Sequence, residues 1–536
     1  MISRFFRSLS SQERNAFWAI LVLHLVLISF PYLWALTTTP NGFVYGGLLY
    51  NPDDQNVHLA WARQAAEGQF FFRDLFTNES LLSGERPLFT NLLCWLIGVL
   101  SALTTIPTIW LYHAFRIIFA ALTLLLFFAL TTRLTADRRV RITATALAAF
   151  AGGAGFLSAL IPGFNWMDRP DNASFPMMPE AFTFASSLIF TLNIASMALL
   201  LAVYLLSLHA WETGSRKAAI GAGVATLFLA NFHTYDVFPL LGALFIWAIF
   251  AWRTPAQRGR LIFLPAVIVG AAIPVLYQLF VFRGSEEFRI KALTNTPAPP
   301  IWDVAISYGP LLLLAIGGAI IAWREVKLRL PIFWMLVTLG LIYAPVSFAR
   351  KMIEGLHLPL CFLAAVGLIW LVGKLQPTAQ RMVTVIAVLI LSLSSFQFVT
   401  WCIDNARDNN ASRANILMPP LYLTQGDAAA MQFLKQQPRG KVVLCLPFIG
   451  NYMPRESGQT VMIGHWAETL HFPDKLGQVL GFYGGKMEAE QAKEWLNKNR
   501  IGYVVIGSYE NQLGARLPLE LQEIFEANGT RVYAVP

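Results

Sequence analysis

Two adjacent carboxylates, Asp53 and Asp54, open a polar stretch in which His58 follows at helical spacing. Asn51 and Pro52 before them favour a helix start, where acidic side chains oppose the positive end of the helix dipole. The same side chains suit proton transfer, because Asp54 and His58 share one helix face and neighbouring carboxylates can accept a proton. The stretch is therefore either a well-formed helix start or an acid–base or metal site. In a functional site we expect His58 to contact the substrate.

A basic pair, Arg350 and Lys351, lies in a short polar stretch that also holds Glu354 and His357. A phosphate would attract both cations through charge-assisted contacts, and headgroup anchoring by the two side chains is the alternative. Arg116, in an otherwise apolar segment, is either a further phosphate ligand or a paired or snorkelling residue. We expect Glu354 and His357 to contact a substrate beside the basic pair.

Two other polar groups are candidates for substrate contact. His233 and Asp236 interrupt two apolar segments, and such side chains either line a protein-enclosed cavity or form a polar helix turn. Near the C-terminus, His465, Trp466 and Glu468 directly follow a predicted strand. Loops at strand ends commonly hold ligands in α/β domains, and Trp466 either stacks on a sugar or is a buried structural residue.

The composition restricts the class of protein that presents these residues. Of the 536 residues 13% are charged, about half of the ~25% typical of soluble domains, and 56% are hydrophobic, with a mean hydropathy of +0.53. These values exclude a single soluble globule, a disordered chain and a disulfide scaffold. The net charge of +9 is spread in short basic clusters between apolar segments, which indicates membrane topology rather than nucleic-acid binding.

Eleven apolar segments are long enough to cross a hydrocarbon core of about 30 Å. They lie at 16–36, 107–132, 142–162, 182–209, 218–234, 235–252, 261–282, 304–323, 331–348, 358–373 and 382–403. A further apolar stretch, Pro87 to Thr105, is predicted to lie along the outer membrane surface or to re-enter. Counting it as a span would place the four arginines of 133–141 outside, against the positive-inside rule.

The basic residues predict the orientation of these spans. With eleven spans the cytoplasmic segments carry 17 Lys and Arg in 54 residues, whereas the outer segments carry 9 in 125. We therefore expect a membrane module at 1–403, with a first outer loop at 37–106, and an extracytoplasmic α/β domain at 404–536. Short apolar runs typical of strands lie at 441–447, 460–464, 501–507 and 530–535.

The first outer loop resembles that of the GT-C superfamily of membrane glycosyltransferases. The likeness rests on Asp53 and Asp54, on Gly68 fifteen residues after Asp53, and on the aromatic stretch Phe70 to Phe72. The protein mannosyltransferase and aminoarabinose transferase branches have Asp-Glu, a helix and Gly-Asp-Trp at this place. This chain departs from that pattern with Asp54 in place of Glu and with Gln69 to Phe71 in place of Gly-Asp-Trp-like residues, which leaves the subfamily and the acceptor open.

Two further segments are similar to parts of the same superfamily. Pro87 to Thr105 resembles its juxtamembrane helix, and the second span, which ends in Arg133, resembles its Leu-Ala-Arg-Arg exit. A soluble outer domain after the last span also fits. The fold class that we expect is a polytopic α-helical membrane protein of GT-C type with a C-terminal extracytoplasmic α/β domain. Its estimate of about eleven spans comes from the apolar segments and departs from the pattern of the superfamily.

The resemblance also implies an activity. Such enzymes take a sugar from a polyprenyl-phosphate carrier on the outer leaflet and transfer it to a glycan, a lipid or a protein. Asp53 would be the catalytic base, with Asp54 beside it, and Arg350 and Lys351 would stabilise the departing phosphate. One base and one displacement imply inversion at the anomeric carbon.

A second acidic loop of the chain is the candidate metal site. Many GT-C enzymes use such a loop to hold a divalent metal or to orient the acceptor, which implies Asp168, and after it Asp171, as tentative ligands. Oxygen-rich sites suit Mg²⁺ or Mn²⁺. The alternative is a hydrophilic turn without a ligand.

Two other classes of function stay open at this point. A transporter or flippase of lipid-linked sugars would show inverted repeats and ionisable groups at mid-membrane, whereas this chain has no evident repeat and places its acids outside. A non-catalytic glycan-binding membrane scaffold is the third possibility. For the enzyme we expect a plasma (inner) membrane location, contact with membrane lipids and no nucleic-acid partner.

Overall fold

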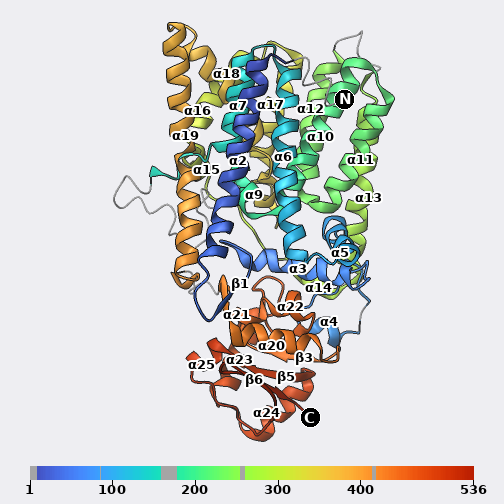
Figure 1. The fold of residues 1–536 in the computed structure, drawn as a ribbon. Helices are drawn as coiled ribbons and strands as arrows, with labels where there is room; N and C mark the ends of the chain where they lie inside the picture. The colour runs from blue at the N-terminus through green and yellow to red at the C-terminus, as the bar shows by residue number, and fades with distance from the viewer. Residues whose placement is uncertain (1–8, 85, 158–177, 254–259, 413–417) are drawn as a thin grey trace. The chain divides into compact units, whose positions relative to one another are not determined.

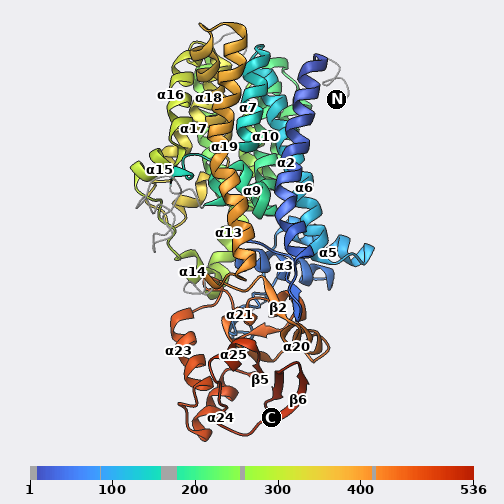
Figure 2. The same cartoon turned by 60° about the vertical axis from the view of Figure 1, so that its left-hand side comes forward.

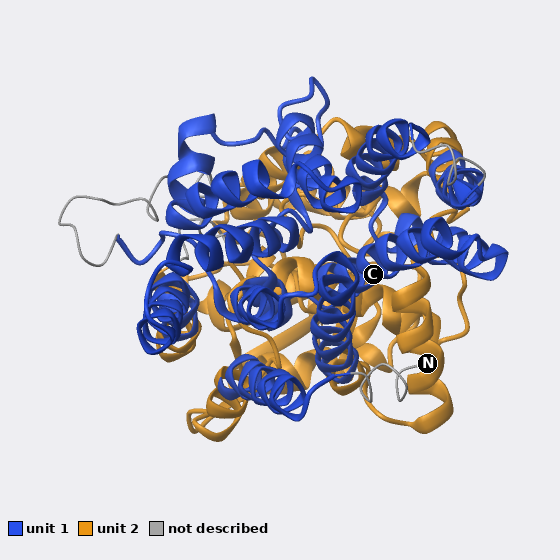
Figure 3. Cartoon of the chain, turned by 90° about the horizontal axis from the view of Figure 1, so that it is seen from above, with its two compact units in different colours: residues 1–30, 113–277, 295–400 blue, residues 31–112, 278–294, 401–536 orange. Residues whose placement is uncertain are grey.

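The computed structural model describes residues 9–84, 86–157, 178–253, 260–412 and 418–536. The contacts between residues divide the chain into two compact units (Figure 3). Unit 1 comprises residues 1–30, 113–277 and 295–400, and unit 2 comprises residues 31–112, 278–294 and 401–536. Each unit is therefore assembled from three separate stretches of the chain.

Long apolar helices dominate unit 1 (Figure 1). Four helices have residues in both units: α2 (Ser11–Thr37), α6 (Thr108–Leu134), α13 (Phe263–Gly284) and α19 (Pro377–Arg407). The others are α7 (Arg138–Phe150), α9 (Thr183–Ile189), α10 (Thr191–Thr213), α11 (Arg216–Phe232), α12 (Val237–Trp252), α15 (Ile301–Tyr308), α16 (Pro310–Ala322), α17 (Arg329–Leu341) and α18 (His357–Val372). Short 3-10 turns join them: η2 (Pro179–Ala181), η3 (Thr234–Asp236), η5 (Val326–Leu328) and η6 (Ala349–Ile353).

Each of the eleven predicted spans contains helix, but the helices differ in length. Among the described residues six helices are long and apolar enough to cross a membrane, and seven if α15 and α16 count as one span bent by 89°. The bend falls at Gly309, whose φ of 48° favours glycine. The remaining predicted spans correspond to α7, α11, α17 and α18, which are only 13 to 17 residues long. The chain is thus an integral membrane protein, and the count of eleven stays a prediction.

Small residues allow close helix packing in unit 1. A Cβ atom added to Gly318 of α16 would lie 1.8 Å from the carbonyl oxygen of Leu363 in α18, and one added to Gly367 would lie 2.2 Å from that of Leu314. The two helices therefore approach each other with their backbones, which is the way helices associate where lipid gives no hydrophobic driving force.

Unit 2 combines the first outer loop with the C-terminal region. Its helices from the first outer loop are α3 (Pro52–Ala66), α4 (Glu79–Leu82) and α5 (Leu92–Thr104), and α14 (Glu286–Ala292) follows α13. The C-terminal helices are α20 (Gln425–Lys435), α21 (Pro447–Gly450), α22 (Met453–Ser457), α23 (Phe472–Tyr483), α24 (Ala489–Lys498) and α25 (Ser508–Gln512). The predicted helix at Pro87 to Thr105 is confirmed as α5, which packs closely on α3 because Gly98 lets the carbonyl oxygen of Ala62 approach.

The C-terminal α/β region contains a mixed sheet in the order β4-β3-β5-β7-β6. Figure 2 labels two of its strands, β5 and β6, beside α24 and α25. Its strands are β3 (Val442–Leu444), β4 (Thr460–Val461), β5 (Ile501–Ile506), β6 (Gln522–Ala527) and β7 (Thr530–Ala534). β3, β4 and β5 are parallel, whereas β7 pairs antiparallel with both β5 and β6. Of the five strands in this sheet, the sequence predicted all but β6, whose polar residues at an exposed sheet edge give no apolar run.

The first outer loop adds to this region by backbone pairing. β1 (Phe43–Tyr45) pairs antiparallel with β2 (Tyr422–Thr424). Further along the loop, the carbonyl oxygen of Leu75 accepts a hydrogen bond from the backbone N–H of Val461, and Thr77 bridges to Ile463. The segment from Leu75 to Thr77 thereby covers the open edge of the sheet at β4. This pairing positions the residues around it, including the candidate site.

Candidate functional site

The start of α3 presents the two predicted catalytic carboxylates. Pro52 occupies the first helical position, as predicted, and Asn51 is the N-cap residue, although its side chain makes no capping hydrogen bond. Asp53 and Asp54 fall in the first turn. The two differ in access, because Asp53 is 4% exposed and the side chain of Asp54 is 53% exposed.

His465 meets both carboxylates within unit 2. Its Nε2 atom lies 3.2 Å from Oδ1 of Asp54 and 3.7 Å from Oδ2 of Asp53. The Nδ1 atom faces the backbone N–H groups of Ala467 and Glu468 at 3.0 and 3.2 Å, and an acceptor at Nδ1 requires the proton to reside on Nε2. The buried ring therefore donates a hydrogen bond from Nε2 to Oδ1 of Asp54, with Asp53 close by.

The charges around His465 favour its protonated form. Burial opposes a charge on the ring, but the hydrogen bond with Asp54 and the charges of Asp53, Asp54 and Glu468 raise the pKa of His465 to about 9. The two backbone N–H groups at Nδ1 act in the opposite direction, because they favour an unprotonated nitrogen there. In either state Nε2 carries the proton, so a donor faces the carboxylates throughout.

Side-chain hydrogen bonds hold α3 against the C-terminal region. The Nδ2 group of Asn56 donates to Oδ1 of Asn451 at 2.5 Å, and Arg455 donates to Oδ1 of Asn56 at 2.9 Å. On the other side of the site, Thr469 donates from its hydroxyl to the carbonyl oxygen of Phe76 at 2.7 Å. The helix start and the loop that carries His465 are each fixed by contacts that are remote in sequence.

A second charged group includes Glu468 of the same loop and is called the Lys291 cluster: Asp74, Glu287, Lys291 and Glu468. Lys291 donates to Asp74, to Glu468 at 2.7 Å and to Glu287 at 3.2 Å. Burial opposes the charge on Lys291, but the three carboxylates raise its pKa above the ordinary value. Burial and the charge of Asp74 raise the pKa of Glu287 to about 8, so this group shares a proton near neutral pH.

Sequence analysis missed Asp74, Glu287 and Lys291 and identified only Glu468 of this cluster. The segments that carry them are far apart in the chain and meet through the pairing of the first outer loop with β4. One local signal was available, because Glu287 and Lys291 are spaced i and i+4 on a short helix. That pattern is common on exposed helices and does not by itself indicate a buried cluster.

In unit 1, the structure brings together three predicted substrate contacts, called here the His233 cluster: His233, Asp236 and Glu354. Nδ1 of His233 lies 2.8 Å from Oδ1 of Asp236 and 3.4 Å from Oε2 of Glu354. Asp236 and Glu354 are 0% and 1% exposed. His233 precedes the turn η3, Asp236 is its last residue, and Glu354 follows η6, so two loops that are more than 100 residues apart contribute.

The basic pair lies beside this turn. Nζ of Lys351 lies 5.1 Å from the ring centre of Tyr235, a cation–π contact. The backbone N–H of Arg350 donates to the carbonyl oxygen of Thr296 at 3.3 Å, and its buried Nε finds no hydrogen-bond partner among the described residues. Lys351 thus contacts the segment between His233 and Asp236, and a phosphate role for the pair stays a prediction.

Arg116 is enclosed within unit 1. Its guanidinium donates to the carbonyl oxygens of Ile28 at 3.2 Å and Ser187 at 2.8 Å, and its Nε donates to His113 at 3.3 Å. These bonds join α2, α6 and α9. The arrangement accounts for a charge in an apolar helix, and a role in phosphate binding stays a prediction.

Other predicted contacts have structural partners. Nδ1 of His58 lies 3.4 Å from the hydroxyl of Tyr112, and the buried His357 lies 3.0 Å from the hydroxyl of Thr183. Trp466 is 49% exposed and stacks beside His465, so its ring is available to a ligand. The predicted metal ligands Asp168 and Asp171 lie outside the described residues.

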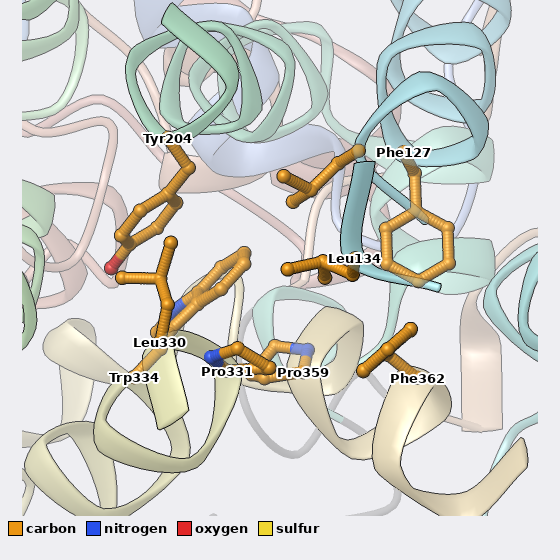
Figure 4. Close-up of a pocket in the computed structure, with 9 residues that line it drawn as sticks. Phe127, Leu134, Tyr204, Leu330, Pro331, Trp334, Pro359 and Phe362 are labelled. Carbon is orange, nitrogen blue, oxygen red and sulfur yellow. The ribbon is translucent and has the colours of Figure 1, made fainter. Parts of the chain in front are cut away.

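An apolar pocket of unit 1 does not offer catalytic groups. Figure 4 shows that side chains of α6, α10, α17 and α18 surround it, among them Phe127, Tyr204, Trp334 and Phe362. Its lining contains neither an acid nor a base. In the described chain, the side chains able to do acid–base chemistry lie at the charged clusters instead.

No family model and no curated protein matches this chain. Solved structures do match. The apo oligosaccharyltransferase of Archaeoglobus fulgidus superposes with a TM-score of 0.55 at 12% identity, over 97% of this chain and 74% of that one. ArnT from Cupriavidus metallidurans bound to undecaprenyl phosphate gives 0.55 at 12% identity, over 96% and 98%. The mycobacterial arabinofuranosyltransferase AftD gives 0.54 at 13% identity, over 96% of this chain and 40% of that one.

All three structures are GT-C glycosyltransferases. At these identities the similarity is one of fold, and it extends over nearly the whole chain, including both units. The resemblance inferred from the first outer loop is therefore confirmed at the level of the fold. The chain is an integral membrane protein with the fold of the GT-C glycosyltransferases.

Proposed function

We propose that this protein is a membrane glycosyltransferase that moves a sugar from a polyprenyl-phosphate carrier to an extracytoplasmic acceptor. The observation that carries the proposal is the meeting of Asp53, Asp54 and His465, which places a carboxylate pair and a fixed hydrogen-bond donor at one point of unit 2. A glycosyl transfer without a nucleotide donor requires little more than a base and a bound leaving group.

The donor class is proposed from the structural neighbours. One structure of the Archaeoglobus fulgidus enzyme holds a dolichol-phosphate together with an inhibitory peptide, and ArnT holds undecaprenyl phosphate. Both ligands are polyprenyl-type phosphates, although they are bound by different proteins from different organisms. We therefore propose a lipid-phosphate sugar as donor, and a glycan, lipid or protein as acceptor.

In the proposed reaction, the carboxylate of Asp53 or Asp54 takes the proton of an acceptor hydroxyl. The acceptor oxygen forms a bond to the anomeric carbon while the bond from that carbon to the phosphate oxygen breaks, which inverts the configuration. Asp54 is open to solvent, whereas Asp53 needs a substrate that reaches past its buried position. His465 holds the pair in orientation through Nε2–H, and we assign the negative charge of the departing lipid phosphate to Arg350 and Lys351.

A divalent cation is part of the proposal. One structure of the Archaeoglobus fulgidus enzyme contains zinc and sulfate. In this chain carboxylates are the groups that would hold such an ion, and a bound cation would neutralise charge on a phosphate oxygen. The location we propose is the plasma membrane, with the active site and residues 404–536 on the extracytoplasmic side.

The reaction is tested first in cells. A strain that lacks this protein should accumulate its lipid-linked sugar, which mass spectrometry of extracted lipids would identify. The wild-type gene should restore the normal lipid profile, and the double variant Asp53→Asn/Asp54→Asn should not, although it is present in the membrane at the wild-type level. An unchanged lipid profile in the deletion strain would contradict the proposed activity.

A fusion experiment tests the orientation. Alkaline phosphatase joined after Pro536 is active only when exported, so the proposed topology predicts an active fusion. An inactive but stable fusion would place the C-terminal region in the cytoplasm and would remove the proposed extracytoplasmic site.

A further inference from the structure

The His233 cluster carries more negative charge than its surroundings neutralise. Among the residues that the structure describes, no lysine or arginine forms an ion pair with Asp236 or Glu354, and their only charged partner is His233. The charge of Glu180 acts on Glu354 as well, which adds to the excess. Two buried carboxylates with a single histidine are expensive unless a positive charge joins them.

The hydrogen-bonding capacity of the cluster is also largely unused. Both carboxylate oxygens of Glu354 and Oδ2 of Asp236 are buried and accept no hydrogen bond from any part of the chain that the structure describes. Only Oδ1 of Asp236 is satisfied, by His233. Buried acceptors of this kind normally have a partner, so three unused oxygens at one point indicate a ligand that donates positive charge.

The spacing of the atoms suits a metal ion. One ligand atom from each of His233, Asp236 and Glu354 lies within 4.8 Å of the others. The two separations from Nδ1, 2.8 and 3.4 Å, bracket the ~3.3 Å edge of a tetrahedron whose bonds are about 2.0–2.1 Å long. Small rotations of the side chains would equalise them.

We propose that His233, Asp236 and Glu354 form a binding site for one divalent cation. The mixed nitrogen and oxygen ligands favour Zn²⁺ or Mn²⁺ over Ca²⁺ and Mg²⁺, which prefer oxygen alone. Three protein ligands leave a coordination position for a water molecule or a substrate oxygen. The site differs from the acidic pair Asp168 and Asp171, to which sequence analysis assigned a metal.

A structural alternative makes different predictions. The cluster could exist without metal if a proton were shared between Asp236 and Glu354, with His233 as a hydrogen-bond partner. In that case added metal would not stabilise the protein, and replacement of Glu354 by Gln would not alter its response to metal. The two explanations are therefore separable on the purified protein, independently of whether it transfers sugars.

The experiment measures metal binding to the full-length protein in detergent. After treatment with chelator, wild type and variants receive Mn²⁺ or Zn²⁺ alone, and affinity is measured by titration and bound metal by mass spectrometry. We expect about one ion per wild-type chain and at least a ~10-fold lower affinity for Glu354→Gln and for Asp236→Asn. Asp303→Asn, which changes a buried acid of unit 1 outside the cluster, should bind metal as wild type does.

Thermal unfolding shows whether a variant that loses metal binding is still folded. Without metal, Glu354→Gln should unfold at the wild-type temperature or above it, because a buried charge has been removed. Metal should raise the melting temperature of wild type and of Asp303→Asn, but not that of Glu354→Gln. Should Glu354→Gln misfold, Asp236→Asn and the metal response of wild type decide the matter. The proposal would be overturned if the wild type bound no metal, or if Glu354→Gln and Asp236→Asn bound it as tightly as the wild type.

Discussion

The two charged clusters differ in the hydrogen-bond donors that their buried carboxylates contact. In unit 2, the Lys291 cluster surrounds one lysine with three carboxylates, and each carboxylate is within 3.2 Å of its Nζ. In unit 1, the His233 cluster gathers two carboxylates around one histidine, and three of their four oxygens have no donor among the described residues. Every carboxylate of the first cluster therefore contacts the lysine, whereas most carboxylate oxygens of the second have no donor and are open to a ligand.

This difference indicates a structural role for the Lys291 cluster and a ligand-binding role for the His233 cluster. The Lys291 cluster fixes Glu468, which follows His465 by three residues, so its pairing helps to position the hydrogen-bond donor that faces Asp53 and Asp54. In the His233 cluster the two carboxylates repel each other, and the hydrogen bond between His233 and Asp236 leaves the oxygens of Glu354 without a donor among the described residues. A paired buried group therefore indicates a structural support, and an unpaired one indicates where a ligand neutralises charge.

The largest expected effect concerns the site that the Lys291 cluster supports. Asp53→Asn keeps the shape of the side chain but removes the base, so turnover in a purified transfer assay should fall by ~10²- to 10⁴-fold. If the acid served only the helix start, turnover would stay near normal and the free energy of unfolding would fall by about 0.5–1 kcal/mol.

The neighbouring carboxylate provides the matched comparison. Asp54→Asn removes the more exposed member of the pair and should lower turnover less. Normal turnover of Asp53→Asn together with an inactive Asp54→Asn would assign the base to Asp54. Normal turnover of both variants would show that unit 2 holds no catalytic pair.

Loss of the central lysine should reveal how strongly unit 2 depends on pairing. Lys291→Met leaves three buried carboxylates without their cation, and breaking a buried pair typically costs about 3–5 kcal/mol of folding free energy. Thermal unfolding in detergent should show a large loss of stability, whereas the exposed control Lys493→Met should unfold as wild type does. In metal-free buffer Glu354→Gln should not be destabilised, so the stabilities of the two variants can be compared directly. Equal stability of Lys291→Met and wild type would remove the distinction between the clusters.

A smaller effect is expected for the basic pair of unit 1. Arg350→Gln/Lys351→Gln should raise the KM for the lipid-linked donor or lower kcat by about 10-fold, because charge-assisted contacts to a phosphate contribute about 1.5–3 kcal/mol each and neighbouring groups compensate in part. Lys374→Gln/Arg381→Gln changes two exposed cations on another segment and serves as the control. Normal donor kinetics in the basic-pair variant would make Arg350 and Lys351 headgroup anchors.

The smallest effect is a pH dependence of the Lys291 cluster. Burial and Asp74 raise the pKa of Glu287 from 4.5 to about 8, so the folded state binds its proton more tightly than the unfolded chain. The resulting stability is complete below pH 4.5 and is lost as the pH rises towards 8, by no more than about 1.4 kcal/mol per pH unit. Denaturant unfolding of Glu287→Gln should lack this slope.

An exposed neighbour completes that comparison. Glu286→Gln alters a side chain that is 69% exposed one position earlier, so it should keep the pH dependence of wild type. A Glu287→Gln variant with the wild-type slope would mean that another group titrates in this range.

Local pattern was sufficient for most elements of the fold. The apolar segments predicted the helices, the short apolar runs predicted β3, β4, β5 and β7, and Asn51, Pro52 and the two aspartates predicted the start of α3. Such features depend on neighbours within a few residues, and the hydrophobic period records them. The lengths of the helices were predicted less well, because the bend at Gly309 and the ends of the short helices depend on packing.

The candidate sites divide in the same way. The residue types of Asp53, Asp54, His233, Asp236 and His465 were sufficient to single them out, since polar groups are conspicuous in an apolar chain. Their partnerships were not predictable. Nothing near Asp54 in sequence indicates His465, which is 411 positions away, and Lys291 is 217 positions from Asp74.

What the sequence by itself determined is therefore the class of the protein: an integral membrane protein of apolar helices with a C-terminal α/β region. What only the tertiary structure decided is which charges neutralise one another and which are left over. Pairing of the first outer loop with β4 brings Asp74 to Lys291, and the approach of η6 to η3 brings Glu354 to His233. The physical reason is that an ion pair or a metal site depends on distances of a few ångströms, which chain separation does not encode.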